Sequence, residues 1–236
     1  MTWKEMFTSS VGKKLVMGLT GISLVLFLTV HVSINACVFA GLFIEEQTGE
    51  MFNKAAHFMG STVLIRIAEV GLFAGILLHI VQGYMLTLQN QKARSVGYAV
   101  AYKDGSKWYS RSMGLLGSII LIFMCVHLYH FWVPARFTHA GLEAEVSYDG
   151  GITNMHNMFD LMRVTFSELW VVIVYSVGCL GLGYHLAHGF QSAFKTIGVH
   201  NKKYHAMLTS VGYGYSVLVV LLFIAMPVAF YLGWIG

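Results

Sequence analysis

Five long apolar runs without a charged side chain divide this sequence. The runs are Leu15 to Ile44, Val70 to Gln91, Ser112 to Ala135, Leu169 to Phe194 and Tyr204 to Gly236. Each reaches the roughly 20 apolar residues that a helix needs to cross a bilayer. Backbone in lipid must satisfy its own hydrogen bonds, which leaves few alternatives to a helix. The pattern therefore predicts an all-α membrane protein with five transmembrane helices in a bundle, forming a single domain over residues 1–236.

Composition agrees with this pattern, and the distribution of charges predicts how the chain is oriented in the membrane. The chain is 56% hydrophobic and 11% charged, with a mean hydropathy of +0.65, whereas soluble domains are about a quarter charged. The N-terminus, the 92–111 loop and the 195–203 loop hold most of the lysines and arginines and few of the acids. By the positive-inside rule the N-terminus is cytoplasmic and the C-terminus lies outside. This topology also accounts for the net charge of +4, so no nucleic-acid partner is expected.

Four of the predicted spans carry a histidine inside the apolar run. Ionisable residues within a membrane are costly, and each is a functional candidate by default. At about 1.5 Å per helical residue, His31 and His127 lie about 25 Å from the nearest cytoplasmic charge. By the same count, His79 and His185 lie about 15 Å from the cytoplasmic end. The four histidines therefore form two pairs at two depths, about 10 Å apart.

The residues around these histidines follow the same pairing. Glycines stand four residues before and after two of them: Gly75 and Gly83 around His79, and Gly181 and Gly189 around His185. Phenylalanines stand four residues before the other two: Phe27 before His31 and Phe123 before His127. Residues four apart share a helix face, so the bare faces suit a flat porphyrin held between two imidazoles. Zinc or copper would favour three or four ligands, often with cysteine or carboxylate.

The sequence therefore predicts two haems, each bound by two histidines. The competing interpretation is that a histidine in a membrane helix is a hydrogen-bonded packing residue, and that glycines four apart serve general helix packing. That interpretation is preferred for His130 and His188, whose flanking residues are bulkier.

Several motifs carry a family resemblance over nearly the whole chain. They are GKKLVMGLTG, LTVHVSIN, FNKAAHFMGS, LLHIVQGY, CVHLYH and YHLAHGFQSAFKTIG. The chain resembles the cytochrome b membrane anchor of succinate dehydrogenases and fumarate reductases, in the single-subunit, five-helix, di-haem form. The resemblance implies that His79 and His185 ligate the haem proximal to the iron–sulfur partner, and that His31 and His127 ligate the distal haem.

The resemblance also implies a role within a larger complex. Electrons would pass between an iron–sulfur subunit, two haem b groups and a quinone, with menaquinone favoured, as in respiratory complex II. A flavoprotein subunit carrying FAD and the iron–sulfur subunit would dock on the cytoplasmic face of a bacterial inner membrane. Succinate or fumarate chemistry would belong to those partners, so enzyme activity is not assigned to the isolated chain. Higher oligomers of the complex, and the direction of electron flow, are left open.

One position departs from the family pattern. Some members have a glutamate two residues before the fourth ligand, linked to transmembrane proton compensation. That position here is Gly183, so this proton route is not expected.

A few charged and polar residues are further candidates. Haem propionates are best held by charge-assisted pairs, and Lys92, Lys195 and Arg163 are placed for this role. Each is equally explained as an interfacial charge. A quinone pocket near the distal haem is predicted from Asn35, Arg66 and Glu69, although a helix-end ion pair explains the last two about as well.

Two alternative functions remain at this stage. The haem-bearing anchor of a hydrogenase or formate dehydrogenase would share bis-histidine haems but not the motifs quoted above. A proton-coupled transporter would use titrating histidines, and it predicts acids within the spans and inverted sequence halves.

The loops and helix ends also have expected structures. The segment 45–61 is expected to be a solvated loop, and a short interfacial helix is expected between Arg136 and Arg163. The third span is expected to stop near Pro134. Gly212 and Gly214 are expected to allow close helix packing in the fifth span.

Overall fold

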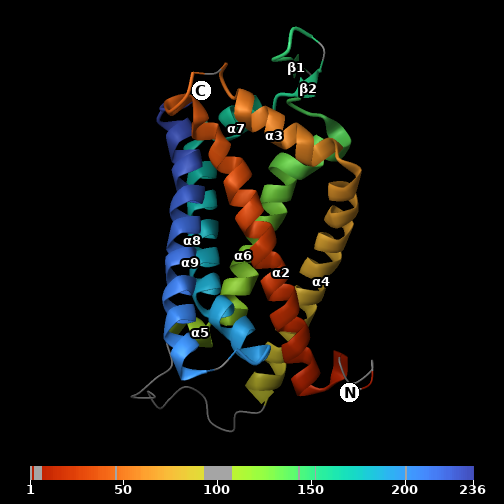
Figure 1. Ribbon diagram of the computed structural model, residues 1–236, viewed down its shortest axis with the longest axis vertical. Coiled ribbons are helices and arrows are strands. Elements are labelled where there is room, and N and C mark those ends of the chain that lie inside the picture. The colour runs from red at the N-terminus through yellow and green to blue at the C-terminus, as the bar shows by residue number, and fades with distance from the viewer. Residues whose placement is uncertain are drawn as a thin grey trace. The chain divides into compact units, whose positions relative to one another are not determined.

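The predicted fold class is confirmed by the structure, a computed structural model that describes residues 2, 7–45, 47–92, 108–142, 144–151, 153–199 and 201–236. Most of the chain lies in five long helices (Figure 1): α2 (Ser10–Ala36), α4 (Val63–Lys92), α6 (Met113–His127), α8 (Leu169–Thr196) and α9 (Lys202–Tyr231). Among the described residues, five stretches are long and apolar enough to cross a membrane: Val11–Leu42, Val63–Lys92, Met113–Thr138, Leu169–Thr196 and Ala206–Tyr231. The side of the membrane that each terminus faces stays a prediction.

Shorter elements extend or connect these helices. They are the 3-10 helix η1 (Cys37–Leu42), the α-helices α3 (Glu50–Ser61), α5 (Trp108–Arg111) and α7 (Met158–Thr165), and the π-helical turns η2 (Leu128–Trp132) and η3 (Pro134–Thr138). Strands β1 (Glu145–Val146) and β2 (Met155–His156) form an antiparallel pair. The short helix expected between the third and fourth spans is α7.

The expectation of a solvated loop between the first two spans is wrong, because α3 occupies most of it. This helix buries Phe52 and Asn53, so it has an inward face that the polar composition concealed. Glu50 is the first residue of the helix, where the helix dipole stabilises a negative charge. It also pairs with Lys54 one turn later at 2.5 Å. The hydrogen bond from the Lys54 ammonium holds the pKa of the Glu50 carboxyl below its ordinary value.

The third span, predicted to stop near Pro134, passes this proline and ends at Thr138. Proline has no N–H to donate to the carbonyl four residues earlier. The chain accommodates it by widening into π turns, in which the Val133 N–H donates to Leu128 O and the His139 N–H donates to Pro134 O. His139 then ends the span in a left-handed conformation, with φ of 52°.

The chain forms two compact units, and each draws on all five long helices. The first unit comprises Met1–Phe27, Val70–Ile119 and Gly181–Val217; the second comprises Leu28–Glu69, Ile120–Leu180 and Leu218–Gly236. The single domain expected over residues 1–236 stays a prediction.

Helix α8 supplies many of the buried side chains in both units. Tyr175 and Cys179 are buried in the second unit, and Leu186 and Phe190 are buried in the first. By contrast, apolar residues of α4 are exposed, including Leu64 at 74%. Large exposed apolar surface of this kind suits contact with lipid tails.

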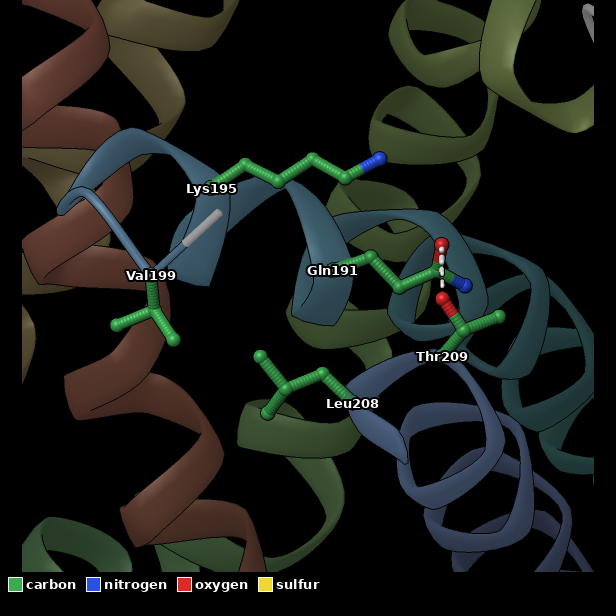
Figure 2. Close-up of a pocket in the computed structure, with 5 residues that line it drawn as sticks. All are labelled: Gln191, Lys195, Val199, Leu208 and Thr209. Carbon is green, nitrogen blue, oxygen red and sulfur yellow. Dashed lines mark hydrogen bonds between the residues drawn. The ribbon is translucent and has the colours of Figure 1, made fainter. Parts of the chain in front are cut away.

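In the first unit α8 packs against α9 through a glycine. A Cβ on Gly212 would lie only 2.9 Å from Phe190 Cδ1, so the two helices can approach this closely because Gly212 has no side chain. Near the same contact, Thr209 Oγ1 donates to Gln191 Oε1 at 3.5 Å, as Figure 2 shows. A Cβ on Gly214 would meet no atom within 4 Å, so the close packing expected of both glycines is found at Gly212 alone.

In the second unit, Asn53 joins α3 to the segment that leads into α7. Its Nδ2 donates to Tyr148 Oη at 2.8 Å and to Asn157 Oδ1 at 3.0 Å. Its Oδ1 accepts from the Phe159 backbone N–H at 2.9 Å. The residue has no exposed surface, so one amide satisfies three buried or half-buried partners.

We expect Asn53→Ala to lower the free energy of unfolding by about 1–3 kcal/mol, because it leaves the Phe159 N–H without an acceptor. Limited proteolysis of the 143–157 segment and thermal unfolding in detergent measure this loss. The control is Asn154→Ala, which removes an exposed asparagine from the same segment. Equal protease sensitivity in the two variants would contradict the joining role.

Candidate functional site

The structure brings His79 of α4 together with His185 of α8. Both belong to the first unit. Their ring centroids lie 6.1 Å apart, with the ring planes inclined at 61°. The residues sit in the middle turns of their helices, so neither ring is at a helix end. This is the pairing that the sequence predicts for one of the two centres.

The second pair, His31 of α2 and His127 at the end of α6, lies in the second unit. The ring centroids are 5.8 Å apart, and the planes are nearly perpendicular at 89°. The other pairing that the sequence predicts is therefore also present as a contact. The role of all four histidines as iron ligands stays a prediction.

The spacing within each pair suits two ligands on opposite sides of one metal atom. Metal bonds to imidazole nitrogen are about 2 Å long, and two opposed bonds of that length put the ring centroids about 6 Å apart. Among the described residues, no group of three or more His, Cys, Asp or Glu side chains could hold a metal ion. A pair of imidazoles alone is the donor set for a metal whose other positions are filled by a ligand ring, as in haem.

Unpaired buried nitrogens occur in both pairs. In the described part of the chain, the buried side-chain atoms without a hydrogen-bond partner are His127 Nδ1, His185 Nδ1, His156 Nδ1 and Gln82 Oε1. The first two belong to the pairs, and Gln82 follows His79 by three residues on α4. Leaving such an atom unpaired costs about 1–3 kcal/mol. Fold stability alone does not account for these unpaired atoms.

The opposite member of each pair has a polar neighbour at Nδ1. Thr20 Oγ1 lies 3.1 Å from His79 Nδ1, and Asn35 Nδ2 lies 3.4 Å from His31 Nδ1. Thr20 is not among the candidate residues that the sequence pattern indicates. Its signal is weak, because a threonine beside two glycines in the run GLTG is also typical of helix packing.

The flanking glycines behave in two ways. A Cβ on Gly75 would meet no atom within 4 Å, and one on Gly189 would meet only His185 Cδ2 at 4.0 Å. A Cβ on Gly83 would lie 3.6 Å from Met17 Cε, and one on Gly181 would lie 3.2 Å from Ile119 Cγ2. One glycine on each helix therefore leaves its face beside the histidine open, and the other serves helix packing.

Aromatic rings surround the His31–His127 pair. Besides His31, the rings whose centroids lie within 6.0 Å of His127 include Phe123, Phe131 and Tyr175, and Phe223 lies 5.7 Å from His31. The sequence indicated Phe123 but not the others: Tyr175 and Phe223 come from helices distant in the chain, and Phe131 lies four residues after His127 in η2.

His130 has an ordinary structural explanation. Its Nδ1 lies 3.1 Å from Tyr175 Oη, and the two rings stack at 5.8 Å with an interplanar angle of 7°. This agrees with the packing role preferred for it from the sequence.

The three propionate candidates are all exposed. Lys92 and Lys195 lie in the last turns of α4 and α8, which are the helices that carry His79 and His185. Arg163 Nε donates to Asp160 Oδ1 at 2.8 Å, so an acidic partner already satisfies part of its guanidinium. Their contact with a propionate stays a prediction.

The quinone candidates fall into two groups. Asn35 lies at His31, where its Nδ2 also donates to His31 O at 2.8 Å. Arg66 pairs with Glu69 at 3.4 Å, but the stronger partners of this carboxylate come from the end of the third span. Trp132 Nε1 donates to Glu69 Oε1 at 2.6 Å, and Arg136 donates to Oε2 at 3.1 Å. The structure brings the second group together as an ion-pair network.

We expect Glu69→Ala to lower the free energy of unfolding by about 1–3 kcal/mol, because the Trp132 and Arg136 donors lose their half-buried acceptor. Arg66→Ala, which removes only the more exposed ion pair, is expected to cost at most about 1 kcal/mol. Thermal unfolding in detergent compares the two variants. A loss from Arg66→Ala that matches the loss from Glu69→Ala would show that the network does not depend on the buried donors.

Comparison of the chain with known protein families, with curated proteins and with solved structures finds no match. The histidine geometry and the motifs of the chain itself are therefore the basis for assigning a function.

Proposed function

We propose that this chain is the di-haem cytochrome b membrane anchor of a succinate:quinone oxidoreductase, the respiratory complex II. The observation that carries the proposal is the presence of two imidazole pairs, with centroid separations of 6.1 Å and 5.8 Å, on helices long enough to cross a membrane. The motifs that resemble the succinate dehydrogenase and fumarate reductase anchors give the proposal its particular family.

The residues support haem over a small metal ion. Each pair offers two nitrogens and, in the described residues, no third His, Cys, Asp or Glu, which is too few for a structural zinc site. The open faces at Gly75 and Gly189 are where a flat group beside His79 and His185 would need space. A haem held by each histidine pair would supply one-electron transfer.

The chain's own residues then have defined tasks. His79 and His185 would hold one iron, and His31 and His127 would hold the other. The apolar helices exclude water, and the aromatic rings around His127 pack against its imidazole. These are the levers by which a protein tunes a haem: axial ligands, hydrogen bonds and burial.

The partners follow from charge and from the family. The lysines and arginines near the N-terminus and in the loops after α4 and α8 would form the cytoplasmic face, although residues 93–107, including Arg94, Lys103 and Lys107, lie outside the described residues. A flavoprotein subunit with FAD and an iron–sulfur subunit would dock there and carry the dicarboxylate chemistry. The complex would reside in a bacterial inner membrane. The mass of the purified complex would show whether it forms higher oligomers.

The quinone, with menaquinone favoured, would bind near the His31–His127 centre. Asn35 is the best placed of the three predicted contacts, because it already lies against His31. Arg66 and Glu69 take part in the ion-pair network with Arg136, which favours a helix-end role for them. Lys92 and Lys195 would serve the propionates of the His79–His185 centre, and Arg163 those of the other.

A reduced-minus-oxidised spectrum and a haem count on the purified chain test the proposal. We expect two haem b groups per chain. A chain without haem would overturn the cytochrome assignment and return the transporter alternative, whereas a single haem would overturn the paired arrangement. Copurification with FAD and iron–sulfur subunits tests the complex, and copurification with a hydrogenase or formate dehydrogenase subunit would favour that alternative.

The two neighbouring histidines of α8 provide a matched test of the ligands. We expect His185→Ala to lose one haem, because its ring faces His79, and His188→Ala to retain both. The haem count and the spectrum measure the difference. The opposite result would show that His188, and not His185, is the ligand.

A further inference from the structure

The two histidines of the His79–His185 pair are held in different ways. His79 Nδ1 lies 3.1 Å from Thr20 Oγ1 on α2. His185 Nδ1 is buried and is without a partner in the described part of the chain. Among the described residues, a third helix therefore contributes a polar group to one side of this pair only.

The Thr20 hydroxyl has three acceptors within reach: Val16 O, Met17 O and His79 Nδ1. A threonine hydroxyl has one hydrogen and two lone pairs. Thr20 Oγ1 donates that hydrogen within its own helix, to Val16 O at 2.8 Å, with Met17 O at 3.3 Å. With the hydrogen placed on Val16 O, only lone pairs remain for His79, and a hydrogen bond between the two groups then requires the hydrogen to belong to His79 Nδ1. A neutral imidazole protonated at Nδ1 has its free electron pair on Nε2, and that pair is what a metal binds.

Backbone packing keeps this hydroxyl in place. A Cβ on Gly21 would lie 3.7 Å from His79 Cε1, and one on Gly18 would lie 3.3 Å from Thr196 Cβ on α8. Small residues on both sides of Thr20 thus bring α2 close to α4 and α8. The distance between Thr20 and His79 is set by the approach of helices and not by a flexible side chain.

The corresponding contact in the other pair differs in kind. Asn35 Nδ2 donates to His31 O at 2.8 Å, which fixes the amide orientation because the reverse would place oxygen against oxygen. The group near His31 Nδ1 is therefore an amide nitrogen, which carries hydrogens and accepts none. Asn35 cannot accept a hydrogen from the ring, as Thr20 does from His79.

We propose that Thr20 is a positioning residue for the His79–His185 centre: it accepts the Nδ1–H of His79, keeps the free electron pair on Nε2, and lowers the reduction potential of the iron bound there. The inference rests on the proposed function, because it takes the bound group to be haem. An acceptor at Nδ1–H makes the ligand nitrogen more basic. A more basic ligand stabilises ferric iron more than ferrous iron, so removing the acceptor raises the potential.

Thr20→Val tests this step, because it removes the hydroxyl and keeps the shape of the side chain. In a potentiometric titration of the purified chain, we expect both haems to remain and one of the two midpoint potentials to rise. Outer ligand partners typically change metal affinity by about 10–100-fold. A tenfold loss of preference for the ferric state corresponds to about 59 mV for one electron. Thr20→Ser, which keeps the hydroxyl, is expected to retain the original potentials.

The matched control is Thr87→Val. Thr87 lies on α4, and its Oγ1 donates to the carbonyl four residues earlier, Gly83 O, at 2.9 Å, as Thr20 does to Val16. We expect this variant to leave both potentials unchanged.

The outcomes separate this inference from the proposed function. Two haems with unchanged potentials in Thr20→Val would overturn the role of Thr20 and leave the cytochrome assignment intact. Loss of one haem from Thr20→Val alone would support the role, whereas the same loss from Thr20→Ser would overturn it, because the hydroxyl is still present. A wild-type chain without haem would overturn the proposed function itself.

Discussion

The structure depends above all on the cost of placing imidazole rings inside apolar helices. Each ring has two nitrogens, and lipid or packed apolar side chains satisfy neither. The chain meets this constraint by bringing the rings together in pairs, with Thr20 at His79 and Asn35 at His31. A buried nitrogen is nevertheless left over in each pair, at His185 and His127. A bound group that takes an electron pair from Nε2 of each ring would account for the pairing of the rings, and it would leave these two Nδ1 atoms without a partner.

The long helices and the histidine pairing were accessible from sequence because each depends on a regular repeat. Apolar runs longer than the bilayer is thick predict spans without reference to any partner, and counting helical rise matched His79 with His185. The groups that orient the rings were not accessible in this way. Thr20 is 59 residues from His79, and Trp132 is 63 residues from Glu69, so their roles depend on how helices dock. Glycines show the same division, since Gly75 and Gly83 look alike in sequence but only Gly83 lies against another side chain.

The segments outside the spans were the least predictable for a related reason. The polar sequence of α3 resembles a loop, and its helical state depends on burying Phe52 and on the three bonds of the Asn53 amide. Those partners come from about 100 residues further along the chain. Local composition reports the charge of such a segment but not the surface on which it folds.

The π turns around Pro134 have a consequence for the register of the third span. A π turn contains one residue more than an α turn, and each helical residue adds about 100° of rotation. Residues beyond Trp132 are therefore displaced around the axis from where an uninterrupted α-helix would put them. Arg136, which lies in the second of these π turns, donates to Glu69, and Trp132, which ends the first, donates to the same carboxylate. The number of residues between Trp132 and Arg136 thus matters as much as their identity. Removing one of them would keep every side chain of the network, yet would turn Arg136 away from Glu69.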